Sequence, residues 1–358
     1  MRRVQTVSIL ALLLAACTAQ PATTPGAATP SQAPTGTDAP SPTAEPTASP
    51  SPAPTFEGHP ATGLALVQFP DPGSPASQIF VVEEDGSLRQ VTGLEGGIGA
   101  STPVWSPDRT QLAFGPPKVG FPGITGQVSV VNADGSGERV LGEGWQQRWS
   151  PDGTRLLIHE KDDVTSEPPS MWIQDVATGE VTNLGQGFDG HWIDDDHIGF
   201  QRLLLLSDGA FSTELYTMAL DGSDPVLLPV EPETTAVWSP DGSQVLLVHE
   251  GSIAVAEADG SNPRDLVGGV SPVWSPDGTR VVLEYDFNQD ALPLLALVDL
   301  DGAEIWSGPV GDAPTWSPDG TRIAVEITYP ESVVQVLDAA TGEVLWELPG
   351  ASQPNWGP

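Results

Sequence analysis

The sequence predicts an all-β protein, and three observations carry that prediction. A unit that begins with tryptophan returns about every 40 residues, and seven Asp-Gly or Thr-Gly turn signals fall between short apolar runs. No stretch of helical length shows persuasive helical periodicity. A period near 40 residues with short strands is typical of propeller blades. The expected fold is a seven-bladed β-propeller, or a six-bladed one if a degenerate repeat is malformed.

The repeated unit predicts a tight turn followed by a buried strand. Five copies read Trp-Ser-Pro-Asp, and they begin at Trp105, Trp149, Trp238, Trp274 and Trp316. Degenerate copies begin at Trp192 and Trp356, and successive tryptophans are 44, 43, 46, 36, 42 and 40 residues apart. Proline suits the second position of a type I turn, and short acidic side chains stabilise turns. We therefore expect architectural roles for the repeated aspartates, and tryptophan plates packed between blades.

The seven hairpin signals form a second register, offset from the first. They lie at 85–86, 134–135, 178–179, 221–222, 259–260, 301–302 and 341–342. Asp-Gly between apolar runs is a strong hairpin signal. The first hairpin precedes every repeat tryptophan, whereas Trp356 follows every hairpin. Residues 354–356 are therefore expected to supply the first strand of the blade that begins near Leu64, which closes the ring and removes an exposed edge.

The Trp-Ser-Pro-Asp-Gly unit resembles the repeat of TolB-type propellers, which also occurs in the propeller domains of prolyl-oligopeptidase-like proteins. The resemblance covers roughly residues 64–356 and implies the propeller fold. Propellers carry many different functions, so the resemblance is specific for the fold only. It suggests protein interaction in the cell envelope, although TolB has an additional N-terminal domain where this chain has a linker.

The first residues predict secretion and lipid anchoring. Arg2 and Arg3 precede a short apolar run, which ends in small residues before Cys17. A basic start, an apolar centre and small residues are typical of a secretory signal. The sequence from Leu14 to Cys17 resembles the bacterial lipobox, which implies acylation of Cys17 and cleavage before it. The single cysteine excludes an intramolecular disulfide.

The composition divides the chain into three predicted segments. Residues 1–16 are the predicted signal peptide, and residues 17–56 are the acylated cysteine and a tether in which ten prolines alternate mainly with Thr, Ala and Ser. Such a segment buries too little apolar surface to fold alone. Residues 57–358 are the predicted propeller, with 11 basic and 46 acidic residues. This charge disfavours nucleic acids and suits cationic partners or simple solubility.

Four residues near the ends of equivalent strands are candidate ligand-binding residues. His159 and His249 each close a second strand of a predicted blade, and Glu284 and Glu326 sit near the same place in other blades. A ring of imidazole and carboxylate groups at one end of a propeller channel could bind a ligand or a divalent cation. The alternative is that they are solvated strand ends. His249 is offset by one residue from His159, so the two side chains could point to opposite faces of their strands.

The densest polar cluster predicts either a metal site or a variant turn. It comprises His191, Asp194, Asp195, Asp196 and His197, where three aspartates replace the usual Ser-Pro-Asp turn. Oxygen and nitrogen donors of this kind suit a hard or borderline cation. The other interpretation is an exposed turn. The same repeat contains an apolar insertion, Leu203 to Leu206, which is either a lengthened strand or a partner-facing patch.

The sequence favours a non-catalytic binding module of the cell envelope. No Gly-x-Ser-x-Gly motif is present, and no room remains for an attached hydrolase domain. Expected partners are an envelope protein, a peptide or a glycan, with membrane contact through the lipid alone and no cofactor beyond a divalent cation. The expected location is the outer face of the cytoplasmic membrane, or the periplasm or outer membrane of a two-membrane host. The alternative is a hydrolase or lyase acting on carbohydrate, lactone or ester substrates in the channel.

Overall fold

The computed structural model describes residues 58–71, 74, 76–94, 99–115, 126–144, 146–159, 169–207, 211–221, 223–285, 293–328 and 331–357. They belong to one compact unit, Ala53–Pro358. The predicted signal peptide, Cys17 and the tether lie outside the described residues. Within the ranges just given, no helix is long and apolar enough to span a membrane.

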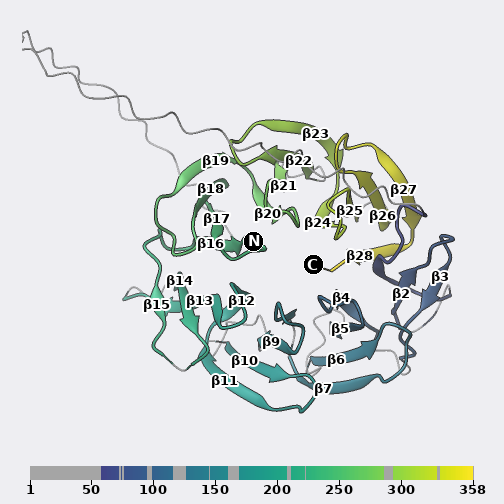
Figure 1. Cartoon of the computed structure of the whole chain (residues 1–358), viewed down its shortest axis with the longest axis horizontal. Coiled ribbons are helices and arrows are strands. Elements are labelled where there is room, and N and C mark those ends of the chain that lie inside the picture. Colours follow the sequence, from purple (N-terminus) through teal and green to yellow (C-terminus); the bar gives the residue numbers. More distant parts are fainter. Residues whose placement is uncertain are drawn as a thin grey trace, which may run out of the picture. The chain divides into compact units, whose positions relative to one another are not determined.

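Seven four-stranded antiparallel sheets stand around a central axis, which confirms the seven-bladed propeller (Figure 1). From the inner to the outer strand, blade 1 is β28 (Ala351–Asn355), β1 (Ala65–Gln68), β2 (Gln78–Val82) and β3 (Leu88–Gln90); blade 2 is β4 (Ser101–Trp105), β5 (Gln111–Gly115), β6 (Gln127–Asn132) and β7 (Arg139–Glu143); blade 3 is β8 (Gln146–Trp149), β9 (Arg155–His159), β10 (Ser170–Asp175) and β11 (Val181–Gln186); and blade 4 is β12 (Phe188–Trp192), β13 (His197–Leu205), β14 (Phe211–Ala219) and β15 (Val226–Leu227). Blade 5 is β16 (Thr235–Trp238), β17 (Gln244–His249), β18 (Ser252–Glu257) and β19 (Arg264–Gly268); blade 6 is β20 (Val270–Trp274), β21 (Arg280–Tyr285), β22 (Leu294–Asp299) and β23 (Glu304–Val310); and blade 7 is β24 (Asp312–Trp316), β25 (Arg322–Ile327), β26 (Val333–Asp338) and β27 (Val344–Pro349). The degenerate fourth repeat thus forms a complete blade.

The ring closes as the sequence predicts. Strand β28 from the end of the chain pairs with β1, with Ala65 opposite Asn355 and Gln68 opposite Ala351. Blade 1 therefore joins the two ends of the propeller sequence in one sheet. This pairing leaves no inner strand of the ring without a neighbouring strand in its own blade.

The hydrophobic core lies between the blades. Seven clusters of buried apolar residues are present, and each combines residues of two adjacent blades. Trp105 is 3% exposed and packs with Leu112 of its own blade and Ala65 of blade 1. The repeat tryptophans are thus inter-blade plates, because each blade has an apolar face that only its neighbour can cover.

The repeated turns are held by local hydrogen bonds. The Ser106 hydroxyl donates to Asp108 at 2.6 Å, and the amide of Thr110 donates to the same carboxylate at 3.0 Å. Equivalent serine–aspartate bonds occur in the other four complete copies. These bonds, chiefly that from Ser106, hold the pKa of Asp108 below its ordinary value. The aspartates therefore serve the turns, as the repetition predicts.

Arginines of the repeat clamp neighbouring blades together. The Arg155 guanidinium lies over the Trp192 ring of the next blade, 5.1 Å from its centroid, and donates to the Asp195 carbonyl at 2.6 Å. Arg280 repeats this arrangement three blades further on, over Trp316 at 5.0 Å. A guanidinium stacks favourably on an indole face. These arginines explain much of the scarce basic charge of the propeller.

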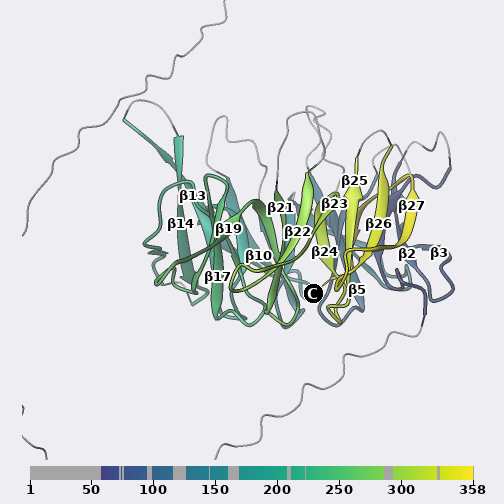
Figure 2. The same cartoon turned by 90° about the horizontal axis from the view of Figure 1, so that it is seen from above.

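The two faces of the ring differ. Strand direction alternates within each blade, so first-to-second and third-to-fourth connections share one face, which we call the turn face. The other connections lie on the opposite face, which we call the loop face. Figure 2 shows β13 and β14 rising further than the other strands on the loop face. Each has nine residues, and no other described strand exceeds seven.

Candidate functional site

Three of the four predicted ligand residues occupy equivalent positions. His159, Glu284 and Glu326 each stand ten residues after the tryptophan of their blade, at or near the loop-face end of the second strand. Each pairs with the inner strand, as Glu326 does with Asp312. His249 is displaced by one residue and pairs with Ser252 beside a tight turn. By the alternation of strand side chains, His249 points to the other face of its sheet.

The carboxylates of Glu284 and Glu326 connect neighbouring blades. The amide of Ala313 donates to Glu284 Oε1 at 3.2 Å, and the amide of Gln353 donates to Glu326 Oε2 at 2.9 Å. Ala313 and Gln353 have φ values of 48° and 50°, and the register of both inner strands shifts beside them. A bulge of this kind turns an amide away from its own sheet. Part of the hydrogen-bonding capacity of both glutamates is thereby used within the ring.

Burial makes these carboxylates hard to ionise. It raises the pKa of Glu284 and of Glu326, and the nearby Asp312 carboxylate adds to both shifts, while the amide bonds oppose them. Burial also raises the pKa of Asp312 itself. Three carboxyl groups with raised pKa therefore stand on the inner side of blades 6 and 7.

Replacing Glu326 with glutamine is expected to raise the urea midpoint of unfolding at pH 7. A pKa raised by folding means that the folded chain binds the proton more readily than the unfolded chain, so stability rises as the pH falls through the raised value. As the pH falls from 7 to 5, the urea midpoint of the variant should rise less than that of the parent chain, because the glutamine side chain does not titrate. This rise in stability ends at lower pH. There the turn aspartates with lowered pKa, such as Asp108, become protonated, and their contribution to stability is lost. Exposed Glu343→Gln is the control, and a lower midpoint for Glu326→Gln at pH 7 would contradict the expectation.

The three aspartates of the predicted metal cluster form a turn. The Asp196 amide donates to Asp194 Oδ1 at 2.8 Å, and His197 Nδ1 lies 2.9 Å from the same oxygen. The Asp195 carboxylate accepts the amide of Asp152 from blade 3 at 2.9 Å. This geometry matches the variant-turn interpretation. Among the described residues, no three His, Cys, Asp or Glu side chains gather so that they could hold a metal ion, and a divalent cation stays an expectation.

His191 belongs to a different group of residues, on the inner strands of blades 3 and 4. Its Nδ1 lies 3.1 Å from the Asp189 carbonyl, and Arg148 Nη2 lies 3.4 Å from Asp189 Oδ1. Burial, reinforced by the Arg148 charge, lowers the pKa of His191 to about 4, so the imidazole is neutral at pH 7. The group comprises a guanidinium that is 44% exposed, a carboxylate and a neutral imidazole. It can bind an anion or accept a proton.

Sequence reasoning missed Arg148 and Asp189. The available signal was the residue immediately before each repeat tryptophan, which is valine in three of the seven copies. Arg148 and His191 occupy this position in two consecutive repeats. A charged residue and a histidine at an otherwise mostly apolar inner-strand position indicate a polar site facing the axis.

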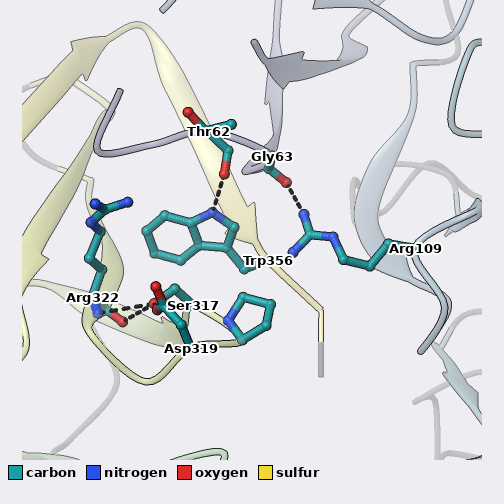
Figure 3. Close-up of a pocket in the computed structure, with 8 residues that line it drawn as sticks. Thr62, Gly63, Arg109, Ser317, Asp319, Arg322 and Trp356 are labelled. Atoms are coloured by element: carbon teal, nitrogen blue, oxygen red, sulfur yellow. Dashed lines mark hydrogen bonds between the residues drawn. The ribbon is translucent and has the colours of Figure 1, made fainter. Parts of the chain in front are cut away.

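A cavity of about 350 Å³ lies on the turn side of the ring closure (Figure 3). Trp356 Nε1 donates to the Thr62 carbonyl at 3.2 Å, and Arg109 Nη2 donates to the Gly63 carbonyl at 2.6 Å. Arg322 lines the opposite wall and donates to the Pro60 carbonyl at 3.0 Å. These bonds tie the segment before β1 to blades 1, 2 and 7. Each group named here makes a hydrogen bond that holds the ring closure together. We therefore interpret the cavity as a structural feature of the closure.

The lengthened hairpin of blade 4 is the most apolar projection of the described surface. Leu205 is 69% exposed, Leu206 43% and Phe211 54%. Leu205 and Phe211 are directly opposite in the register and therefore share one face of the hairpin. Among the other exposed large apolar residues, Phe69 follows β1, and the rest, such as Val140, lie singly or in pairs on outer strands. The predicted apolar insertion is thus a lengthened strand whose tip faces solvent.

Comparison with known proteins supports the fold. No model of a known protein family matches the chain, and no curated protein matches its sequence. TolB from Acinetobacter baumannii matches with a TM-score of 0.51 and 16% identity, over 82% of this chain and 65% of TolB. Oligogalacturonate lyase from Vibrio parahaemolyticus matches with a TM-score of 0.51 and 15% identity, over 67% and 75% of the two chains. Acylaminoacyl peptidase from Pyrococcus horikoshii matches with a TM-score of 0.57 and 17% identity, over 79% and 53%.

These likenesses show the β-propeller fold and nothing finer. The chain spans less than two thirds of TolB and about half of the peptidase. The similar structures include a lyase and peptidases as well as TolB, so the fold alone does not identify a function. Function must therefore be argued from the residues of this chain.

Proposed function

We propose that this chain is a lipid-anchored protein of the cell envelope whose propeller is a non-catalytic docking module for a protein partner. The observation that carries the proposal is the projecting blade 4 hairpin, with Leu205, Leu206 and Phe211 exposed at its tip. Exposed apolar groups gathered on a projection mark an interaction site more often than scattered ones do. The Cys17 anchor and the tether rest on the sequence pattern alone.

The charge around the hairpin indicates the chemistry of the partner. The amide of Glu233 donates to the Thr213 carbonyl of β14 at 2.9 Å, which places the acidic segment Glu231–Glu233 beside the hairpin. The whole chain carries a net charge of −35. An apolar tip with acidic surroundings fits an apolar cleft bordered by basic residues. Anionic lipid headgroups would be repelled by the same charge, which favours a protein over a membrane surface.

A photo-crosslinking residue at position 205 of the full-length chain, in its own cells, tests this docking surface. One reproducible protein adduct is expected at position 205, and none of that mass at position 140, where Val140 is 58% exposed on β7. Phe211→Ser should reduce the adduct, because loss of an apolar anchor costs about 2 kcal/mol, or about 30-fold in affinity. The exposed position of Phe211 allows the fold to survive, which circular dichroism verifies.

Other outcomes would count against the proposal. The same adducts at positions 140 and 205 would indicate random encounters, and adducts with lipid alone would replace the protein partner by the membrane. The anchor is tested separately by Cys17→Ala, which should release the chain from the membrane fraction.

A second candidate function rests on the group formed by Arg148, Asp189 and His191. An exposed guanidinium next to an unprotonated imidazole suits an enzyme acting on a carboxylate-bearing carbohydrate. The oligogalacturonate lyase among the similar structures makes this class worth testing. Turnover of an oligogalacturonate by the purified chain, abolished by Arg148→Met, would favour the enzyme.

A further inference from the structure

The blade 4 hairpin has an open backbone edge, which suggests how docking takes place. Strand β12 pairs with β13 only as far as Phe188 opposite Gln201. Beyond that point, residues 202–205 of β13 pair with β14 alone among the described strands. We call residues 202–205 and 211–214 the ribbon. Along its β13 side, the amide and carbonyl groups of alternate residues point away from β14 and have no neighbour among the described strands.

The β14 side of the ribbon is less open. The Thr213 carbonyl accepts the amide of Glu233, and the Leu215 carbonyl accepts the amide of Leu228. Strand β15 pairs with Tyr216 and Thr217 immediately below. A strand added to the ribbon would therefore lie along β13, above the first residue of β12.

Beyond Arg202 at its base, the β13 edge lacks the features that protect the other edges of the molecule. Outer strands of the propeller carry charges, glycine or proline, as β19 does with Arg264 and Asp265 and β23 with Pro309. The β15 edge is only two residues long. Residues 203–205 are three consecutive leucines. A long, apolar and unprotected edge is a template for pairing with another chain.

The two faces of the ribbon differ in polarity. Leu203, Leu205 and Phe211 share one face, on which Leu203 stands opposite Thr213. On the other face Arg202 stands opposite Glu214, so these two charges offset each other locally, and Leu204 stands opposite Ser212. An added strand would place apolar side chains beside the first face and polar side chains beside the second, because strand side chains alternate. The net charge of −35 selects basic residues for the polar positions.

We infer that the partner supplies an extended segment of alternating apolar and basic residues, which adds as a strand to the β13 edge of the ribbon. This inference rests on the proposed docking function and specifies its partner. Main-chain hydrogen bonds to residues 202–205 would supply affinity, and contacts with Leu203, Leu205 and Phe211 would select the segment.

A labelled peptide of eight alternating valine and lysine residues is the probe, titrated into the full-length chain and followed by fluorescence anisotropy. Saturable binding is expected, together with slower amide hydrogen exchange at residues 202–205. Two further peptides carry N-methyl groups on every second backbone amide, one on the valines and the other on the lysines. Only one of the two should bind about tenfold more weakly than the unmethylated peptide, because only alternate amides face the β13 edge. A valine–glutamate peptide should bind about tenfold more weakly than the valine–lysine peptide.

Leu205→Lys and Val140→Lys are the matched variants. Both place a lysine at an exposed strand position, and only the first lies on the ribbon. Leu205→Lys should weaken binding of the valine–lysine peptide about tenfold, because a charged edge repels a basic strand, whereas Val140→Lys should not. Equal losses in both variants would overturn the inference, as would equal binding of the two methylated peptides or unchanged exchange at residues 202–205.

The peptide and crosslinking experiments test strand addition and the docking function separately. A protein adduct at position 205 without peptide binding would leave the docking function standing and make strand addition wrong. Absence of both would overturn the docking function as well.

Discussion

Trp356→Ala is expected to lower the free energy of unfolding by about 4 kcal/mol. The Trp356 side chain is 1% exposed and packs between blade 1 and blade 7, in the cluster that contains Leu64 and Val334. Its indole also donates to the Thr62 carbonyl. The substitution creates a cavity at the one boundary where β28 and β1, from opposite ends of the propeller sequence, must meet. The loss should therefore exceed that for a less buried tryptophan at the same boundary.

Urea unfolding followed by far-ultraviolet circular dichroism measures this loss. Trp346→Ala is the control, because Trp346 is half-buried on the outer strand β27, where its ring meets His59 edge-on at 5.3 Å. We expect the control to lose about 1–2 kcal/mol, since less surface is uncovered. Equal losses in the two variants would mean that ring closure does not depend on Trp356.

Gly199→Ala is expected to destabilise the chain by about 3 kcal/mol, although only one methyl group is added. A Cβ at Gly199 would stand 1.9 Å from Cη2 of Trp238, a buried side chain of the next blade. The overlap involves a ring fixed by its hydrogen bond to the Ala258 carbonyl at 3.0 Å, so the ring cannot move away without losing that bond. Either the blades separate slightly or the indole leaves its position.

A double substitution separates this clash from a general effect of alanine. Combined with Trp238→Phe, Gly199→Ala should cost at least about 1 kcal/mol less than the sum of the two single losses, because phenylalanine leaves room for the methyl group. Gly93→Ala is the control, since a Cβ there meets nothing within 4 Å. Strictly additive losses would show that the contact between Gly199 and Trp238 is not the cause.

Much of the fold could be predicted because each repeat encodes its own turn. The Ser-Pro-Asp turn is made by bonds between residues two to five positions apart, as between Ser106 and Asp108. Such local chemistry is visible in the sequence. The ring closure was also predictable, because the first of the seven hairpins precedes every repeat tryptophan and the last of the seven tryptophans follows every hairpin.

The candidate site could be predicted only in part. The spacing placed His159, Glu284 and Glu326 at equivalent strand ends, and it separated His249 from them. It did not reveal that Ala313 and Gln353 adopt positive φ and turn their amides onto the two glutamates of the preceding blades. Those bonds join residues 27 or more positions apart, and no local pattern announces them.

The sequence by itself determined the propeller repeat, the chemistry of the turns and the presence of an apolar insertion in the fourth repeat. Tertiary structure alone decided which residues come together and which face solvent. His191 and Arg148 come together because β8 and β12 are neighbouring inner strands, although 43 residues separate them. Leu205 and Phe211 are exposed because the ribbon outgrows the strands that would cover it. The repeats specify local geometry. Which residues are buried, and which remain free to contact other molecules, depends on how much of each blade its neighbour covers.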